Sequence, residues 1–159
     1  MTKEQIQEFT RRITQENHSG LILVLCDMVR VYTQDALHAF EEGDETAYMH
    51  AVEQARRANH ELMDCFEPGD PRGRRVICVL RYIYGQYVTS LIKRSPVEFE
   101  ACLRLLDKLQ AAFEQMHSMD TEGAVMKNAH QVYAGLTYGR GTLNESAVCD
   151  DYSKRGFQV

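Results

Sequence analysis

The sequence lacks any apolar run long enough to cross a bilayer, since its longest run extends only from Leu21 to Cys26. Its first residues, Met1 to Gln5, carry no apolar signal core behind the lysine, so we expect no secretory signal. It also lacks a Cys-x-x-Cys pair, and its five cysteines are widely spaced and odd in number. This spacing is typical of a reducing compartment, where most cysteines fill core positions. We therefore expect a soluble, cytoplasmic protein.

The sequence also has fewer basic than acidic residues. Eighteen Lys and Arg residues stand against 23 Asp and Glu residues, which gives a net charge of -5 and a pI near 5.7. A nucleic-acid groove or an anionic membrane surface needs net cationic potential, so neither is expected as the main partner. With 159 residues, the chain is long enough for one domain that folds without disulfide staples.

No stretch alternates apolar and polar residues long enough to predict a strand, whereas helical periodicity recurs four times. The four predicted helices run from Asn17 to Phe40, from Asp44 to Phe66, from Val76 to Leu91, and from Ser95 to Met116. Because their connections are short, neighbouring helices should run in opposite directions. The sequence thus predicts an all-α protein built as an antiparallel, up-down four-helix bundle.

Local signals mark the ends of these helices. Gly43 offers the left-handed position that ends a helix, and Asp44 offers the next N-cap at once. Ser95-Pro96-Val97-Glu98 reads as a capping box, with a serine N-cap, proline in the first turn and glutamate at N3. We expect the fourth bundle helix to start at this serine.

The predicted bundle domain spans residues 1–117, including an N-terminal arm, and a C-terminal extension follows it. Residues 1–16 should form an arm whose short helix, started by Thr2, carries one narrow apolar stripe of Ile6, Phe9 and Ile13. Residues 118–159 form a C-terminal extension, with a short amphipathic helix from Val125 to Leu136 followed by irregular chain.

Residues that would carry catalysis are sparse. A carboxylate-bridged metal bundle needs two Glu-x-x-His motifs, and only Glu114-x-x-His117 is present, so a solvated pair is favoured over a metal site. No glycine-rich phosphate loop follows a strand signal. A Cys–His nucleophile pair stays open, because residues that are neighbours in the fold need not be neighbours in sequence. We predict no catalytic, cofactor-binding or metal-binding residues and no cofactor.

Two polar or aromatic clusters remain to be explained. Arg72, Arg74 and Arg75 gather at the start of the third bundle helix, where positive charge opposes the helix dipole and invites an acidic partner, solvent or Asp70. Tyrosines 82, 84 and 87 point in different directions around that helix, so they cannot all be core. A core edge and a binding surface explain them equally well.

The order of these signals resembles that of the flagellar export chaperones of the FliS family, over residues 5–117. The leucine-rich run from Leu21 to Met28, the acidic turn from Phe40 to Asp44, and the basic turn from Ile92 to Pro96 all fall at family positions without gaps. The family's Glu-Leu pair and aromatic pair have counterparts too. They are Glu61-Leu62 and Tyr82 with Tyr84, and Phe113 stands in place of a tryptophan.

The sequence departs from the family around the expected client surface. Cys26 and Met28 replace a tyrosine and a glycine on either side of Asp27, and Phe9 replaces a tyrosine in the arm. These differences put the client contacts and the role of the arm in question more than the fold.

The resemblance implies a non-enzymatic chaperone that binds the C-terminal segment of flagellin, prevents its premature polymerisation and brings it to the flagellar export gate. A monomer or weak homodimer is expected. Within that interpretation Asp27 and Tyr84 supply polar orientation, and the client lies on exposed parts of two helix faces. The candidate client-binding residues are Leu21, Leu25, Asp27, Val29, Tyr32, Leu80, Ile83, Tyr84, Tyr87 and Leu91.

The flanking segments suggest regulation of that surface. The arm with Ile6, Phe9 and Ile13 would cover the client groove until a client displaces it, and the segment from Val125 to Leu136 either imitates a client helix or is a disordered extension. Two other functions stay open. One is a homo-oligomeric structural bundle whose exposed tyrosines pair between copies, and the other is a bundle enzyme using a metal or a cysteine.

Overall fold

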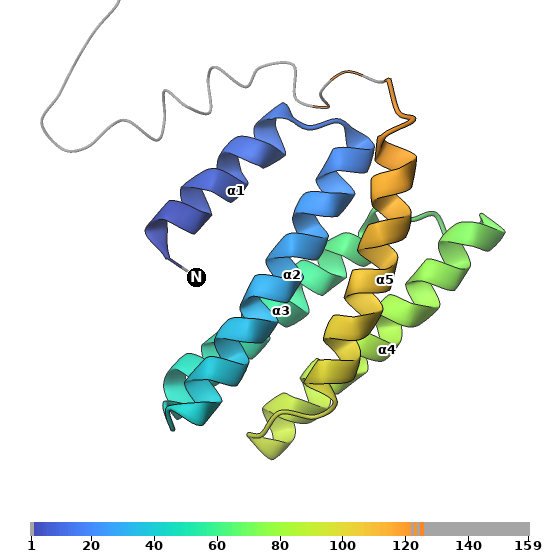
Figure 1. The fold of residues 1–159 in the computed structure, drawn as a ribbon. Coiled ribbons are helices and arrows are strands. Elements are labelled where there is room, and N and C mark those ends of the chain that lie inside the picture. The colour runs from blue at the N-terminus through green and yellow to red at the C-terminus, as the bar shows by residue number, and fades with distance from the viewer. Residues whose placement is uncertain (1, 122, 124, 126–159) are drawn as a thin grey trace, which may run out of the picture. The chain divides into compact units, whose positions relative to one another are not determined.

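The computed structural model describes residues 2–121, 123 and 125, and the elements in this part of the chain are helices (Figure 1). They are α1 (Lys3–Gln15), α2 (His18–Glu41), α3 (Glu45–Asp64), α4 (Pro71–Lys93) and α5 (Phe99–His117). The predicted all-α fold is confirmed. The helix predicted from Val125 to Leu136 lies outside the described residues except for Val125, whose amide donates to the Glu16 carbonyl at 3.0 Å.

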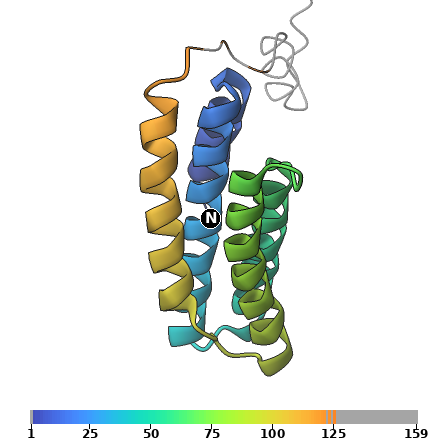
Figure 2. The same cartoon turned by 90° about the vertical axis from the view of Figure 1, so that its right-hand side faces the viewer.

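Helices α2 to α5 form a closed bundle. α2 packs against α3 and α5, α3 packs against α4, and α4 completes the ring by packing against α5. Successive helices run in opposite directions, as Figures 1 and 2 show. α2 and α4 therefore lie on a diagonal of the ring, while α1 packs on the outside of the bundle against α2.

The core consists of the inward stripes of these four helices. Burying each large apolar side chain contributes about 1.5–3 kcal/mol. Cys26 and Cys102 are fully buried in this core, whereas Cys65 is half-buried and Cys78 is exposed, so only two of the four described cysteines fill core positions. The largest fully buried apolar side chains are Tyr48, Tyr87, Leu62, Leu80, Ile83, Leu106, Val24, Val29 and Val52.

The turn between α2 and α3 follows its sequence signals. Gly43 adopts φ 75°, the left-handed region that a β-carbon would strain. The Gly43 amide donates to Phe40 at 3.1 Å and the Asp44 amide donates to Ala39 at 2.9 Å, which is the Schellman pattern. The Asp44 carboxylate then accepts the Ala47 amide at 2.9 Å and caps α3.

The start of α5 differs from the prediction. The helix begins at Phe99 with Glu98 at the N-cap position, where φ is 56° and no side chain caps the helix, so Ser95 is not its N-cap. The cause lies in the last turn of α4, which accepts hydrogen bonds from the backbone amides of the predicted capping motif. The buried Ser90 accepts the Ser95 amide through its carbonyl at 3.3 Å and the Val97 amide through its hydroxyl at 2.9 Å.

The N-terminal arm forms as a helix docked on one neighbour. Its predicted start is confirmed, because Thr2 and Gln5 exchange both hydrogen bonds of a capping box. Phe9 is buried, while Ile6 remains half exposed. Phe9 and Val24 of α2 are buried outside the main core cluster. Since α1 packs only against α2 among the described helices, the arm is what covers that side of α2.

Candidate functional site

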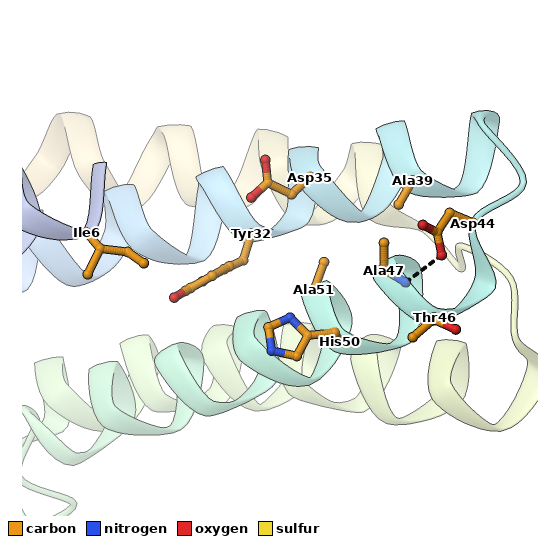
Figure 3. Close-up of a pocket in the computed structure, with 9 residues that line it drawn as sticks. All are labelled: Ile6, Tyr32, Asp35, Ala39, Asp44, Thr46, Ala47, His50 and Ala51. Atoms are coloured by element: carbon orange, nitrogen blue, oxygen red, sulfur yellow. Dashed lines mark hydrogen bonds between the residues drawn. The ribbon is translucent and has the colours of Figure 1, made fainter. Parts of the chain in front are cut away.

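A hollow of about 490 Å³ lies between α2 and α3, and Figure 3 shows the side chains around it. Tyr32 projects from α2 toward α3, and Ile6 of the arm stands at the end of the hollow nearest to Tyr32. Small side chains form much of the remaining wall, and these leave space that larger residues would fill. We call this hollow the α2/α3 groove. It is lined by Ile6, Tyr32, Asp35, Ala39, Asp44, Thr46, Ala47, His50 and Ala51.

The arm, whose Ile6 lines one end of the groove, is held by few contacts. Arg12 donates to Asp27 at 2.9 Å, and its guanidinium carbon lies 5.8 Å from the centroid of the Phe9 ring. Asp27 also accepts from Gln110 of α5 at 3.1 Å. Both members of the Arg12–Asp27 pair are partly exposed, so the pair adds at most about 1 kcal/mol to the docking of the arm.

A second hollow, of about 560 Å³, lies between the end of α3 and the start of α4. Tyr84 lines it, and the Tyr84 hydroxyl accepts from Arg56 at 2.5 Å. The same guanidinium lies 5.4 Å from the centroid of that ring, a cation–π distance. The hollow is lined by His60, Met63, Asp64, Phe66, Pro68, Ile77, Arg81 and Tyr84.

Arg56 is held in place by Glu53, which gives this side of the bundle a predictable response to acid. Glu53 accepts from Arg56 at 2.8 and 2.7 Å and from Arg57 at 2.9 Å, and these bonds lower the pKa of Glu53 from 4.5 to about 2. A lowered pKa means that the contribution to stability is complete above pH 4.5 and is lost as the pH falls toward 2.

We therefore expect the substitution Glu53→Gln to cost about 1 kcal/mol at pH 7, because the ion pairs are only partly buried. Urea unfolding of both proteins between pH 7 and pH 2 measures the difference. The two stability curves should converge as the pH falls below 4.5. A difference that stayed constant down to pH 2 would contradict the assignment to Glu53.

The candidate client-binding residues divide into buried and accessible groups. Leu25, Val29, Leu80, Ile83 and Tyr87 lie in the bundle core, so a client cannot touch them while the bundle is closed. The reason is the diagonal placement of α2 and α4, whose inward faces meet, as the 2.6 Å contact between the Thr33 and Tyr87 hydroxyls illustrates. The partly exposed members are Leu21, Asp27, Tyr32, Tyr84 and Leu91.

The structure brings only some of the partly exposed residues into hollows. Tyr32 lines the α2/α3 groove, Tyr84 lines the second hollow, and Asp27 is engaged by the arm. In the arm, Phe9 is buried, Ile13 is half-buried, and Ile6 lines the groove. Of the candidate client-binding residues, only Tyr32 lines this groove, so the predicted covering role of the arm stays a prediction.

Sequence reasoning missed most of the groove. Asp35, Ala47 and His50 were not singled out, and Ala39 and Ala51, which lie in the core cluster, also form part of its wall. A signal was available, because alanines occur in both helices on either side of the Gly43 turn. Two antiparallel helices with small residues near their shared turn leave a hollow there unless larger neighbours fill it.

A hydrogen-bonded cluster joins the start of α2 to the end of α5. The Ser19 hydroxyl contacts His117 Nδ1 at 2.8 Å and Asp120 Oδ2 at 2.6 Å. In a hydrolytic triad the histidine stands between serine and carboxylate, whereas here serine stands between the two. His117 is thus a half-buried partner of Ser19 and not the solvated residue that was predicted. The described residues hold no group of three potential metal ligands.

The buried cysteines are poor candidates for nucleophiles. Burial raises the pKa of the Cys26 thiol to about 12 and that of Cys102 to about 11. Burial also raises the pKa of Cys65. Since the thiolate is the reactive form, these side chains are held as inert thiols near neutral pH.

The described fold and hollows define a helical-bundle protein with an open groove between two helices and a docked arm at one end of it. In the part of the chain that the structure describes, every helix is too short or too polar to span a membrane. Comparison with known proteins found no matching family model, curated protein or solved structure.

Proposed function

We propose that this chain is a cytoplasmic export chaperone of the FliS type, which binds the C-terminal segment of flagellin and keeps it from polymerising before export. The observation that carries the proposal is the α2/α3 groove, which Ile6 of the arm lines at the end nearest to Tyr32. The order of sequence signals from Leu21 to Phe113 supports the choice of client. Delivery to the export gate belongs to the same proposal.

The chemistry of the groove suits an amphipathic helix. Alanine methyl groups and the Tyr32 ring offer apolar contact, while Asp35, Asp44 and His50 offer polar atoms at its edges. A disordered client would form a helix as it binds, and burial of its apolar side must offset the entropy lost on ordering. Asp44 also caps α3, since its carboxylate accepts the Ala47 amide.

Isothermal titration calorimetry with a peptide covering the C-terminal segment of flagellin from the same organism tests this proposal directly. We expect saturable one-to-one binding with a negative heat-capacity change, the sign of apolar burial. A lack of binding, also after the arm is removed, would reject flagellin as the client. The oligomeric state measured in parallel would then decide whether the homo-oligomeric bundle becomes the better explanation.

Filling the groove should weaken client binding. The Ala47 side chain lines the groove and is exposed, so Ala47→Gln adds atoms where the client would lie without disturbing the core. We expect the dissociation constant to rise at least about tenfold, equivalent to 1.4 kcal/mol. Ala111→Gln on the exposed side of α5 is the matched control and should bind as the wild type does. Equal affinities for the two variants would place the client elsewhere.

Removing the arm should have the opposite effect. Deletion of residues 1–14 removes Ile6, Phe9 and the Arg12–Asp27 pair. The client then binds without spending free energy on displacing the arm. We expect client binding to tighten several-fold, because the fraction of molecules with an open groove rises. Arg12→Gln, which removes the ion pair with Asp27 and the guanidinium contact with the Phe9 ring but keeps Ile6 and Phe9, should give a smaller change in the same direction. Unchanged or weaker binding after the deletion would refute a covering role.

A further inference from the structure

The outer side of α4 differs in charge from the rest of the chain. Between Pro71 and Lys93 the helix carries five cationic residues and no acidic one, in a protein whose net charge is -5. The chain thus concentrates positive charge on one helix. The cationic residues are Arg72, Arg74, Arg75, Arg81 and Lys93.

Three of these arginines are also unusual in having no ion pair within the described residues. Arg74, Arg75 and Arg81 are exposed. The other described arginines lie within 4.0 Å of a carboxylate. Those pairs are Arg11–Glu8, Arg12–Asp27, Arg30–Asp107, Arg56–Glu53, Arg57–Glu53, Arg72–Asp70, Arg94–Glu45 and Arg104–Glu100.

Helical geometry places the three arginines on one face with apolar and small residues. At about 100° per residue, positions 74, 75, 78, 81, 82, 85, 89 and 92 fall within about a third of the circumference. The core residues Leu80, Ile83 and Tyr87 occupy the opposite side. On the outer face Tyr82 is 44% exposed and Ile92 is 78% exposed. We call these eight residues the α4 outer face.

Gly85 lies in the middle of this face without a local reason for being glycine. Its φ is not positive, and a β-carbon built there would meet no atom within 4 Å. Glycine inside a helix is less favourable than alanine. A bare position of this kind allows another helix to approach the backbone closely, with Tyr82 and Ile92 on either side.

We propose that the α4 outer face docks an acidic, amphipathic helix of a partner protein. Carboxylates of that helix would pair with Arg74, Arg75 and Arg81, and its small apolar residues would pack over Gly85. A second copy of the chain is a poor occupant, because two cationic faces repel each other. The net charge of -5 likewise disfavours a nucleic acid. This surface shares no residue with the α2/α3 groove, so the proposal goes beyond client binding.

The test uses a designed peptide in place of the unidentified partner. The probe is an amphipathic helix of about 18 residues with leucine and alanine on one side and glutamate along both edges. A second peptide replaces every glutamate with lysine. NMR spectra of the full chain, labelled with ¹⁵N, locate each peptide, and fluorescence anisotropy measures affinity at low and high salt.

We expect the acidic peptide to shift the amide signals of the α4 outer face and to bind at least about tenfold more weakly when salt rises from 50 to 300 mM. The lysine peptide should not bind. The triple variant Arg74→Glu, Arg75→Glu, Arg81→Glu should lose the interaction. The control triple Lys3→Glu, Arg104→Glu, Lys108→Glu, which changes net charge equally at other exposed sites, should retain it.

A second variant separates docking from charge. Gly85→Gln has room for its side chain in the free protein and should weaken binding of the acidic peptide about tenfold while leaving the circular dichroism spectrum unchanged. The proposal fails if the acidic peptide shifts the amide signals of the α2/α3 groove instead. It also fails if the control triple variant loses binding to the same extent. A single-stranded oligonucleotide that binds the α4 outer face more tightly than the peptide would contradict it as well. Because the assay contains no flagellin, failure here would leave the proposed chaperone function standing. In the same way, a failure of flagellin binding would not reject a partner on the α4 outer face.

Discussion

Replacing Asn59 by aspartate is expected to destabilise the protein by about 3–5 kcal/mol near pH 7, the cost of a buried charge without a partner. Asn59 is fully buried between α3 and α4, and its amide nitrogen donates to the Leu80 carbonyl at 3.0 Å. Among the residues that the structure describes, its Oδ1 atom has no hydrogen-bond partner. In the variant, one carboxylate oxygen would face the Leu80 carbonyl and the other would remain unpaired.

The pH dependence of Asn59→Asp identifies the cause. Burial would raise the carboxyl pKa in the folded state above its unfolded value of about 3.9. The variant should therefore approach wild-type stability below pH 3.9, where both states are protonated, and lose stability as the pH rises toward the raised folded value. Urea unfolding from pH 3 to pH 7, expressed as the difference from wild type, measures this slope.

Asn17→Asp is the matched control for the same chemical change. Asn17 caps α2, with its side chain accepting the Gly20 amide at 2.9 Å, and aspartate performs that role equally well next to the positive end of the helix dipole. Its stability should stay within about 1 kcal/mol of wild type. Asn17 is also buried, so equal losses in the two variants would show that the lack of a hydrogen-bond donor at Asn59 is not the source of the effect.

The hydroxyl pair in the core should respond asymmetrically to substitution. Thr33 donates to the Val29 carbonyl at 2.7 Å and accepts from Tyr87, which is fully buried. Thr33→Val leaves the Tyr87 hydroxyl as a buried donor without an acceptor and should cost about 2–3 kcal/mol. Tyr87→Phe removes a single hydrogen bond while Thr33 keeps its own acceptor, so it should cost about 1 kcal/mol.

A double-mutant cycle tests that explanation. With both hydroxyls removed, no donor is left unpaired, and the double variant should be more stable than Thr33→Val alone. Denaturant midpoints for the four proteins give the coupling free energy, with unchanged slopes serving as the check that the same surface unfolds. Strictly additive losses would mean that the two hydroxyls act independently.

Much of the fold could be predicted because its signals are local. The Asn17 cap, the Gly43 and Asp44 turn and the Thr2 capping box each involve residues within one helical turn, so the surrounding structure had little opportunity to override them. The prediction that α5 starts at Ser95 was wrong, because here a contact with another helix overrides the local motif. Its donors are taken by Ser90, which belongs to the previous helix, and that competition is invisible in a short motif.

The candidate site was harder to predict because periodicity shows which face of a helix is apolar but not which other helix packs against that face. Val29 and Tyr87 belong to strong stripes, and only the order of helices around the bundle determines that these stripes face each other. The groove arises from missing atoms at Ala47 and Ala51, which leave little trace in a pattern of large apolar residues. Tyr32 and Tyr84 are half-buried and line hollows, a position that suits tyrosine because it combines an apolar ring with a polar end.

The tight turn at Gly43 also has a consequence for how the chain folds. It joins α2 and α3 through residues 42–44, so the two helices that line the groove meet at a small loop-closure cost in entropy. Contact between α2 and α5 requires closure over a much longer segment, so we expect it to form later in folding. The groove would then take shape in the earliest hairpin, before α5 completes the ring.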